Sequence, residues 1–119
     1  MSIKSYKFNN GLNFVYQKNT TGLSAINIFV KVGSINEPAH LNGVSHFIEH
    51  MVFKGTEKRQ TSDEITQVFD SIGAYINAGT TLDHTFYTSK CDSDYLEVCL
   101  ETLLDMVFNS KLEKSEIKN

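Results

Sequence analysis

The sequence predicts an α+β fold, a twisted and largely antiparallel sheet with helices packed mainly on one face. Short runs with strand-like alternation or many branched and aromatic residues occur before and between segments with helical periodicity. These strand runs come in consecutive pairs, which argues against the strict strand–helix–strand alternation of a parallel sheet. The expected order is three strands, two helices, two strands, a third helix and the start of a fourth.

The strands are expected in four segments. The first is expected to hold two strands around Asn10-Gly11, a dipeptide favoured in tight hairpins. The last two segments are joined near Leu82-Asp83. The segments are residues 6–19, 23–34, 74–81 and 84–91.

The helices are expected from cap residues and apolar spacing. Asn42 is the predicted N-cap of the first helix and Gly55 its stop, while Thr61 and Glu64 have capping-box spacing before a second helix that stops at Gly73. The apolar stripes are Ile65, Val68, Phe69 and Ile72 in the second helix, and Leu96, Cys99, Leu100, Leu103 and Val107 in the third. The helices are expected at about residues 43–53, at 61–73, at 93–109 and from residue 111 onward.

Composition excludes several classes of protein. The 119 residues carry a formal charge of −3 with no basic run, which argues against nucleic-acid binding. The apolar runs are too short to span a membrane, and the start lacks the features of a signal or transit peptide. We therefore expect the protein to be located in the bacterial cytoplasm, or in an organelle matrix after processing.

Cys91 and Cys99 form no C-x-x-C pair and are predicted to be reduced and buried.

The segment LNGVSHFIEHMVFKGT, residues 41–56, places His46, Glu49 and His50 on one predicted helix. At about 3.6 residues per turn, His50 lies one turn from His46, and Glu49 lies on its other flank. His46, Glu49 and His50 are therefore expected to lie on one face of this helix. The apolar arc roughly opposite is expected to contain Val44, Phe47, Ile48, Met51 and Val52.

Two imidazoles one helical turn apart can hold one Zn²⁺. Glu49 is too close to His50 in sequence to act as a relaxed third ligand, but it is well placed to reach a water on the metal. Zinc lowers the pKa of such a water to about 7, and a carboxylate can take its proton and pass it to a leaving amine. The alternative is a solvated helix face without metal, but the order His-x-x-Glu-His is the inverzincin signature and favours a metal site.

The stretch GVSHFIEHMVFKGT is similar to the active-site segment of the M16 metallopeptidases, which include pitrilysin, insulin-degrading enzyme and the β subunit of mitochondrial processing peptidase. The similarity extends over nearly the whole chain, and the FKGT ending resembles the processing-peptidase branch. It implies a zinc endopeptidase that cuts peptides or presequences, with His46 and His50 as zinc ligands and Glu49 as general base. It also implies a second, related half on the same chain or on a partner subunit.

The resemblance further implies that INAGTT is an edge strand on which Asn77 and the backbone of Ala78 hold the substrate as an added β-strand. Taken alone, Asn77 is better interpreted as a strand-edge asparagine with a local hydrogen bond. His40 and His84 match no ligand position, and Phe53 is expected either to line the cleft or to pack in the core.

The third zinc ligand implied by the resemblance is a glutamate that would fall just past Asn119. Glu113 and Glu116 precede that position, and Glu97 and Glu101 lie on the preceding helix, so none of the four is assigned as a ligand. A catalytic zinc normally has three protein ligands. Residues 1–119 are therefore expected to be the N-terminal part of one catalytic domain, inactive alone and weak in zinc binding.

Two other functions remain open. The first is a non-catalytic relative that acts as a partner or scaffold subunit with the same fold. The second is a small α+β binding module with incidental histidines, which predicts a complete, cooperatively melting domain. The fragment interpretation instead predicts exposed apolar surface.

Overall fold

Two antiparallel sheets form within residues 3–112, which are the residues that the computed structural model describes. The first is a hairpin of β1 (Ile3–Lys7) and β2 (Asn13–Gln17). The second contains β3 (Leu23–Val30), β4 (Tyr75–Thr80) and β5 (Thr85–Asp92) in the order β3-β5-β4. The predicted antiparallel arrangement is confirmed, but the first hairpin is not hydrogen-bonded to the other strands.

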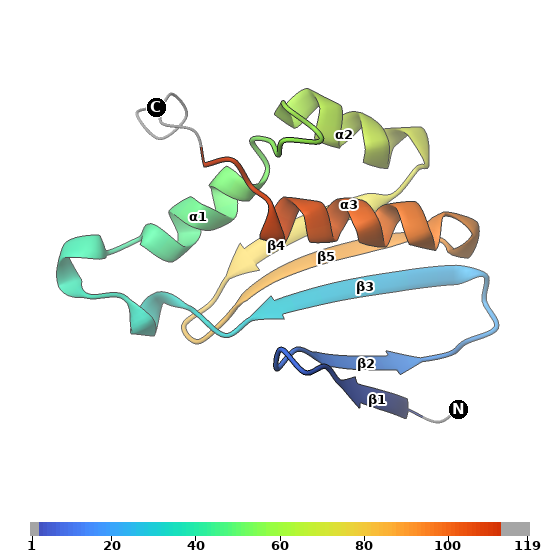
Figure 1. The fold of residues 1–119 in the computed structure, drawn as a ribbon, viewed down its shortest axis with the longest axis horizontal. Helices are drawn as coiled ribbons and strands as arrows, with labels where there is room; N and C mark the ends of the chain where they lie inside the picture. The colour runs from blue at the N-terminus through green and yellow to red at the C-terminus, as the bar shows by residue number, and fades with distance from the viewer. Residues whose placement is uncertain (1–2, 113–119) are drawn as a thin grey trace.

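Three α-helices lie to one side of the three-stranded sheet in the described part of the chain, as predicted (Figure 1). None of them has the length and apolarity needed to span a bilayer. Residues 113–119, where the fourth helix was expected, lie outside the described residues. The α-helices are α1 (Val44–Val52), α2 (Ser62–Ser71) and α3 (Leu96–Phe108), and the short 3₁₀ turns are η1 (Ser34–Asn36), η2 (Ala39–Leu41) and η3 (Ser93–Tyr95).

The ends of α2 follow the sequence prediction closely. The Thr61 hydroxyl oxygen accepts the Glu64 N–H at 3.1 Å, which satisfies one free amide of the first turn. The Glu64 carboxylate accepts the N–H of Gln60, the residue before the N-cap. Gly73 has a φ of +65° and donates its N–H to Asp70 C=O at 3.1 Å, which ends the helix. Helix α1 ends at Val52, within one residue of the predicted end at Phe53, and its C-cap residue is Phe53.

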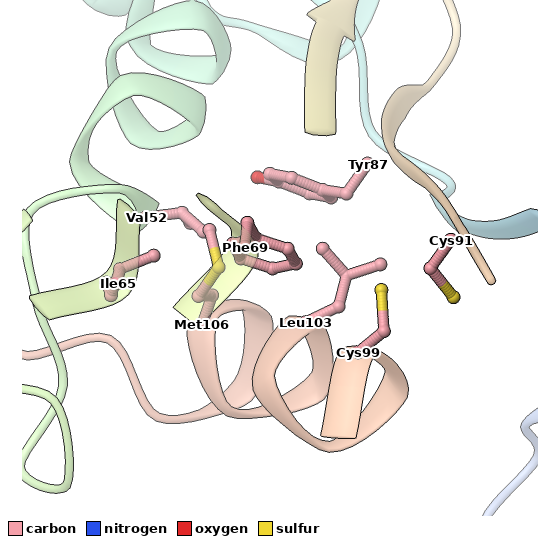
Figure 2. Packing of buried hydrophobic residues seen from close by; sticks show 8 residues of the cluster. All are labelled: Val52, Ile65, Phe69, Tyr87, Cys91, Cys99, Leu103 and Met106. Carbon is pink, nitrogen blue, oxygen red and sulfur yellow. The ribbon is translucent and has the colours of Figure 1, made fainter. Parts of the chain in front are cut away.

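The core fills the space between the sheet and the helices (Figure 2). Alternate side chains of β5 point toward the helices and are buried, whereas their neighbours in the strand are half-buried or exposed. Both cysteines are buried and free, as predicted, and burial raises the pKa of the Cys91 thiol to about 11. Leu96, expected in the apolar stripe of α3, is instead 37% exposed. The buried core cluster is Val52, Ile65, Phe69, Tyr87, Cys91, Cys99, Leu103 and Met106.

A buried polar cluster joins the loop after α1 to the last turns of α3. The Thr56 hydroxyl, fully buried, donates to Asp105 Oδ2 at 2.7 Å, and Arg59 Nη1 donates to the same oxygen at 2.9 Å. Asn109 donates to the other carboxylate oxygen at 3.0 Å. Arg59 also contacts Glu101 at 2.5 Å. The loop is therefore held against α3 by one carboxylate that is only 7% exposed.

Gly55 is required in this loop by backbone geometry. Its φ is +141°, and a Cβ added there would lie 2.4 Å from the carbonyl oxygen of Gln60. Its own carbonyl accepts the Lys111 N–H at 3.0 Å. The FKGT segment thus turns sharply and brings Thr56 to Asp105.

Replacement of Thr56 by valine removes the buried hydroxyl and keeps the shape of the side chain. We expect the free energy of unfolding of Thr56→Val to fall by about 1.5–3 kcal/mol, because Asp105 loses a charge-assisted hydrogen bond. Chemical denaturation of the chain measures this, with the exposed Thr20→Val as the control, expected to change stability by less than about 0.5 kcal/mol. Equal effects of the two substitutions would contradict the role given to Thr56.

The stability of the chain is also expected to depend on pH through Asp105. Burial alone would raise the pKa of this carboxyl, but the hydrogen bonds from Thr56, Asn109 and Arg59 together outweigh it and hold the pKa below its ordinary value of 3.8. The stabilising contribution is therefore complete above that value and is lost as the pH falls through the folded-state pKa. We expect Asp105→Asn to show a shallower loss of stability below about pH 4 than the wild type. The exposed Glu97→Gln should leave the slope unchanged.

Candidate metal and catalytic site

Helix α1 begins on a carboxylate that lies outside the helix. Its N-cap residue is Gly43, with a φ of +88°, and no side chain of the cap residue satisfies the first amides. Instead, Glu37 accepts the N–H of Gly43 at 2.9 Å through Oε1 and that of Ser45 at 2.7 Å through Oε2. These two hydrogen bonds stabilise the charged carboxylate and hold the pKa of Glu37 below its usual range, and the bond from Ser45 has the larger effect. The prediction of Asn42 as N-cap was wrong, because a distant carboxylate provides the cap.

Only part of the predicted apolar arc of α1 is buried, because Met51 and Val52 are buried and Val44 is half-buried. Ser45 and Val52 are buried, and Glu49 is half-buried on the same side of the helix. Phe47 and Ile48, the other members of the predicted apolar arc, are 37% and 45% exposed. Helix α1 contacts β4 at the edge of the sheet, so only a narrow strip of the helix is covered.

Glu49 is held by a side chain of β4. Thr80 donates its hydroxyl to Glu49 Oε2 at 2.6 Å, and this contact is partly buried. Within residues 3–112, Oε1 of the same carboxylate makes no hydrogen bond, so it is free to accept a proton from another group. Tyr87 lies nearby, and burial followed by the negative charge of Glu49 raises its pKa to about 12.

The two histidines of the motif are exposed and unengaged. Neither the His46 nor the His50 side chain makes a hydrogen bond or an ion pair with any residue in the described range, and both residues are exposed. Residues four apart on a helix have neighbouring side chains, with Cβ atoms about 5–6 Å apart. All three motif residues therefore lie on α1, with His46 and His50 on neighbouring turns and Glu49 one residue before His50.

The donor set fits a zinc ion in part. Two neutral imidazoles one turn apart are suitable ligands, and their freedom from other partners leaves them available. No group of three histidine, cysteine, aspartate or glutamate side chains that could hold a metal ion occurs within residues 3–112. The motif thus offers two candidate metal ligands and a candidate base, and residues 3–112 offer no third ligand beside them.

Strand β4 is an edge strand of its sheet, as expected for INAGTT. The Thr81 N–H donates to His84 C=O at 2.8 Å, and hydrogen-bonded pairs alternate along an antiparallel ladder. By this alternation Ala78, which pairs with Tyr87, is a non-hydrogen-bonded position. Its N–H and C=O therefore point to the free edge, where a further strand could pair with them.

The side chain of Asn77 lies on the opposite face of the sheet from the His-x-x-Glu-His motif, because side chains alternate between the two faces of a strand. Asn77 pairs with Thr88, and its exposed side chain lies on the face of the sheet opposite the helices. Ala78 and Thr80 share the face turned toward α1. The structure therefore brings the backbone of Ala78 and the Thr80 side chain toward Glu49, but not the side chain of Asn77.

The remaining predicted candidates are placed outside the motif. His40 is exposed, and His84 contacts Asp83 at 2.8 Å within its own hairpin. Phe53 packs against the core cluster. Glu101 is paired with Lys58 and Arg59, and Glu97 is exposed. Glu113 and Glu116 lie outside the described residues.

A hollow of about 890 Å³ lies between the loop after α1 and the end of α3. None of the motif residues lines it. Its wall includes Asp105, which is already engaged by Thr56 and Arg59, so the hollow belongs to the buried polar cluster of the fold and not to the metal site. It is lined by Glu57, Lys58, Gln60, Asp105, Asn109, Ser110 and Lys111.

Two functional contacts were missed from the sequence. Glu37 acts on α1 from six to eight residues away, and Thr80 reaches Glu49 across 31 positions in the sequence. No local spacing rule identifies either contact, although both residues lie in segments that contributed to the family resemblance.

Comparisons with known proteins show which family the chain is similar to. Residues 13–119 match the family model described as Insulinase (Peptidase family M16). The chain is 39% identical over 117 residues to an uncharacterized zinc protease, YmxG, of Bacillus subtilis, covering 98% of this chain and 28% of that protein. It is 35% identical over 109 residues to the mitochondrial-processing peptidase subunit beta of Dictyostelium discoideum, covering 92% of this chain and 23% of that one.

A solved structure shares the fold. A protease from Helicobacter pylori superposes with a TM-score of 0.91 at 30% sequence identity, covering 97% of this chain and 28% of its own. The chain therefore spans about a quarter of the length of the curated relatives and of the solved structure that it matches.

Loss of the Glu37 carboxylate should loosen the first turn of α1. In Glu37→Ala we expect faster hydrogen exchange at the amides of Gly43 and Ser45, since both lose their acceptor. The amide of Ile65, bonded to Thr61 C=O at 3.2 Å in the first turn of α2, serves as an internal control. Unchanged protection at Gly43 and Ser45 would show that Glu37 does not hold the helix start.

Proposed function

This chain belongs to peptidase family M16, and on that premise we propose that it supplies part of the active site of a zinc-dependent endopeptidase. The observation that supports this most directly is that the side chains of His46, His50 and Glu49 are available to bind other groups. Two imidazoles are exposed and unengaged, and beside them a carboxylate has one oxygen bonded to Thr80 and the other free.

In this proposal His46 and His50 hold the zinc ion as two of its protein ligands. When bound, zinc lowers the pKa of a water molecule to about 7 and polarises the carbonyl to be attacked. The third ligand is a glutamate located after Asn119. With two ligands only, residues 1–119 alone would bind zinc weakly and would be inactive.

Glu49 is the general base. Its free oxygen, Oε1, accepts a proton from the water that attacks the scissile carbonyl, and it later delivers this proton to the nitrogen of the leaving amine. The hydrogen bond at Oε2 keeps the carboxylate on the sheet side of the helix during both transfers. The same group thus serves first as base and then as acid.

The substrate is an extended peptide, such as a presequence, which pairs with the free edge of β4 as an added strand. The outward backbone groups of Ala78 would form part of this ladder. Asn77 would contact the substrate from the other face of the strand. Main-chain pairing of this kind selects extended conformation more than sequence, and it would place a scissile bond beside α1.

We further propose that residues 1–119 form the N-terminal part of one catalytic domain. The short coverage of the relatives and the absence of a third donor within residues 3–112 support this. The rest of that domain and a second, related half would come from the same chain or from a partner subunit. The protein would act in a bacterial cytoplasm or an organelle matrix.

The proposal is tested by Glu49→Gln in the full-length protein with a fluorogenic peptide substrate. Loss of the general base should lower kcat by about 10²- to 10⁴-fold. The activity of the wild type should be abolished by a chelator and restored by zinc.

The matched control is Glu97→Gln, an exposed glutamate on α3, which should retain wild-type kcat. Zinc content measured alongside separates loss of the base from loss of the metal, and Glu49→Gln should keep its zinc. Equal, chelator-sensitive cleavage by the wild type and Glu49→Gln would refute the role of Glu49.

A further inference from the structure

Thr80 is the last residue of β4 and the only group within residues 3–112 that forms a hydrogen bond with the Glu49 carboxylate. Its hydroxyl donates to Oε2 at 2.6 Å, a distance typical of a hydroxyl bonded to a charged carboxylate. The terminal torsion of a glutamate side chain is broad and roughly two-fold, so the torsion alone does not fix the carboxylate plane. One donor bonded to one oxygen removes that freedom and determines which oxygen is left free.

The position of Thr80 is itself held by the segment that precedes α1. The N–H of Ser34 donates to Thr81 C=O at 3.1 Å, and that of Ile35 donates to Leu82 C=O at 2.9 Å. At Gly33, an added Cβ would lie 2.5 Å from the carbonyl of Leu82, so the two segments are in close contact. The hairpin that follows Thr80 is therefore fixed to the chain that leads into α1.

The start of α1 is held from the same segment. Glu37 lies directly after η1 and accepts the first amides of the helix. A closed set of contacts thus runs from α1 through Glu37 to the Ser34–Asn36 turn, on to the β4–β5 hairpin, and back to α1 through Thr80 and Glu49. Within this set, the Thr80–Glu49 bond is the one that reaches the proposed catalytic group.

Strand β4 also carries the free edge. Thr80 and Ala78 are two residues apart, so their side chains share one face and both are non-hydrogen-bonded positions relative to β5. The residue that orients the carboxylate is therefore part of the strand to which the peptide is proposed to pair. Strand β4 would thus position both a peptide bound to its free edge and, through Thr80, the Glu49 carboxylate.

From this geometry we infer that Thr80 is a positioning residue for the general base, which holds Glu49 by its Oε2 so that Oε1 faces the reacting water and the substrate strand. This inference rests on the proposed function. It adds to that function a residue outside the His-x-x-Glu-His motif on which the rate of proton transfer depends.

The test compares Thr80→Val, Thr80→Ser and Thr88→Val in the zinc-loaded full-length protein. Valine keeps the branched shape and removes the donor, and serine restores the donor without the methyl group. Thr88, half-buried in β5 on the opposite face of the sheet, is the matched control. We expect Thr80→Val to lower kcat by about 10- to 100-fold with KM within about twofold, because a misplaced catalytic group costs rate more than binding. Thr80→Ser should recover most of the loss, and Thr88→Val should match the wild type.

Two further measurements separate positioning from damage to the fold. Zinc content should be the same in Thr80→Val and Thr88→Val, and circular dichroism should show both variants fully folded at the assay temperature. In metal-free protein labelled with ¹³C at glutamate carboxyl carbons, the Glu49 resonance, assigned with Glu49→Gln, should shift in Thr80→Val and stay unchanged in Thr88→Val.

A wild-type kcat in Thr80→Val would overturn the inference. So would a Thr80→Ser variant that does not recover activity. A loss of rate in Thr80→Val that only follows a loss of bound zinc would also overturn it. These outcomes are distinct from failure of the proposed function. If Glu49→Gln is inactive while Thr80→Val is fully active, the general base stands and the role of Thr80 falls. If Glu49→Gln is active, the proposed function itself falls.

Discussion

The placement of α1 depends on the hydrogen bonds and the ion pair of the buried Asp105 carboxylate. A charge that is 7% exposed is stable only when it is hydrogen-bonded and paired, and here Thr56, Asn109 and Arg59 meet that requirement together. Two of these partners come from the loop that follows α1. The hydrogen bonds of one buried carboxylate on α3 therefore help to fix where the end of α1 lies, together with the burial of Met51 and Val52.

The helix needs such anchors because it covers little of the core. Only Ser45, Met51 and Val52 of α1 are buried, and Phe47 and Ile48 are exposed. The helix is held instead at three places by polar contacts, which involve Glu37 at its start, Glu49 in its middle and Thr56 beyond its end. Hydrogen bonds are directional, so they fix the rotation of the helix about its axis, and this rotation decides where the two imidazoles point.

Much of the fold followed from local patterns. The strand pairs, the cap at Thr61, the stop at Gly73 and the buried face of α2 were predicted, because turn chemistry and apolar spacing act within a few residues. The errors at α1 have a common cause. The helix was assigned an N-cap at Asn42 and an apolar arc from its own sequence, whereas Glu37 and the sheet edge determine its start and its buried face.

The sequence by itself determined which chemical groups are available and their spacing on one helix, since a separation of four residues places His46 and His50 on neighbouring turns of any α-helix. It also placed β4 in the chain and marked it as a strand. Only the tertiary structure decided that Thr80 bonds to Glu49, that Ala78 points to a free edge and that Asn77 faces away. These depend on how β4 pairs with β5 and where α1 crosses its edge, and such long-range contacts arise from packing and hydrogen bonding between segments that are distant in the sequence.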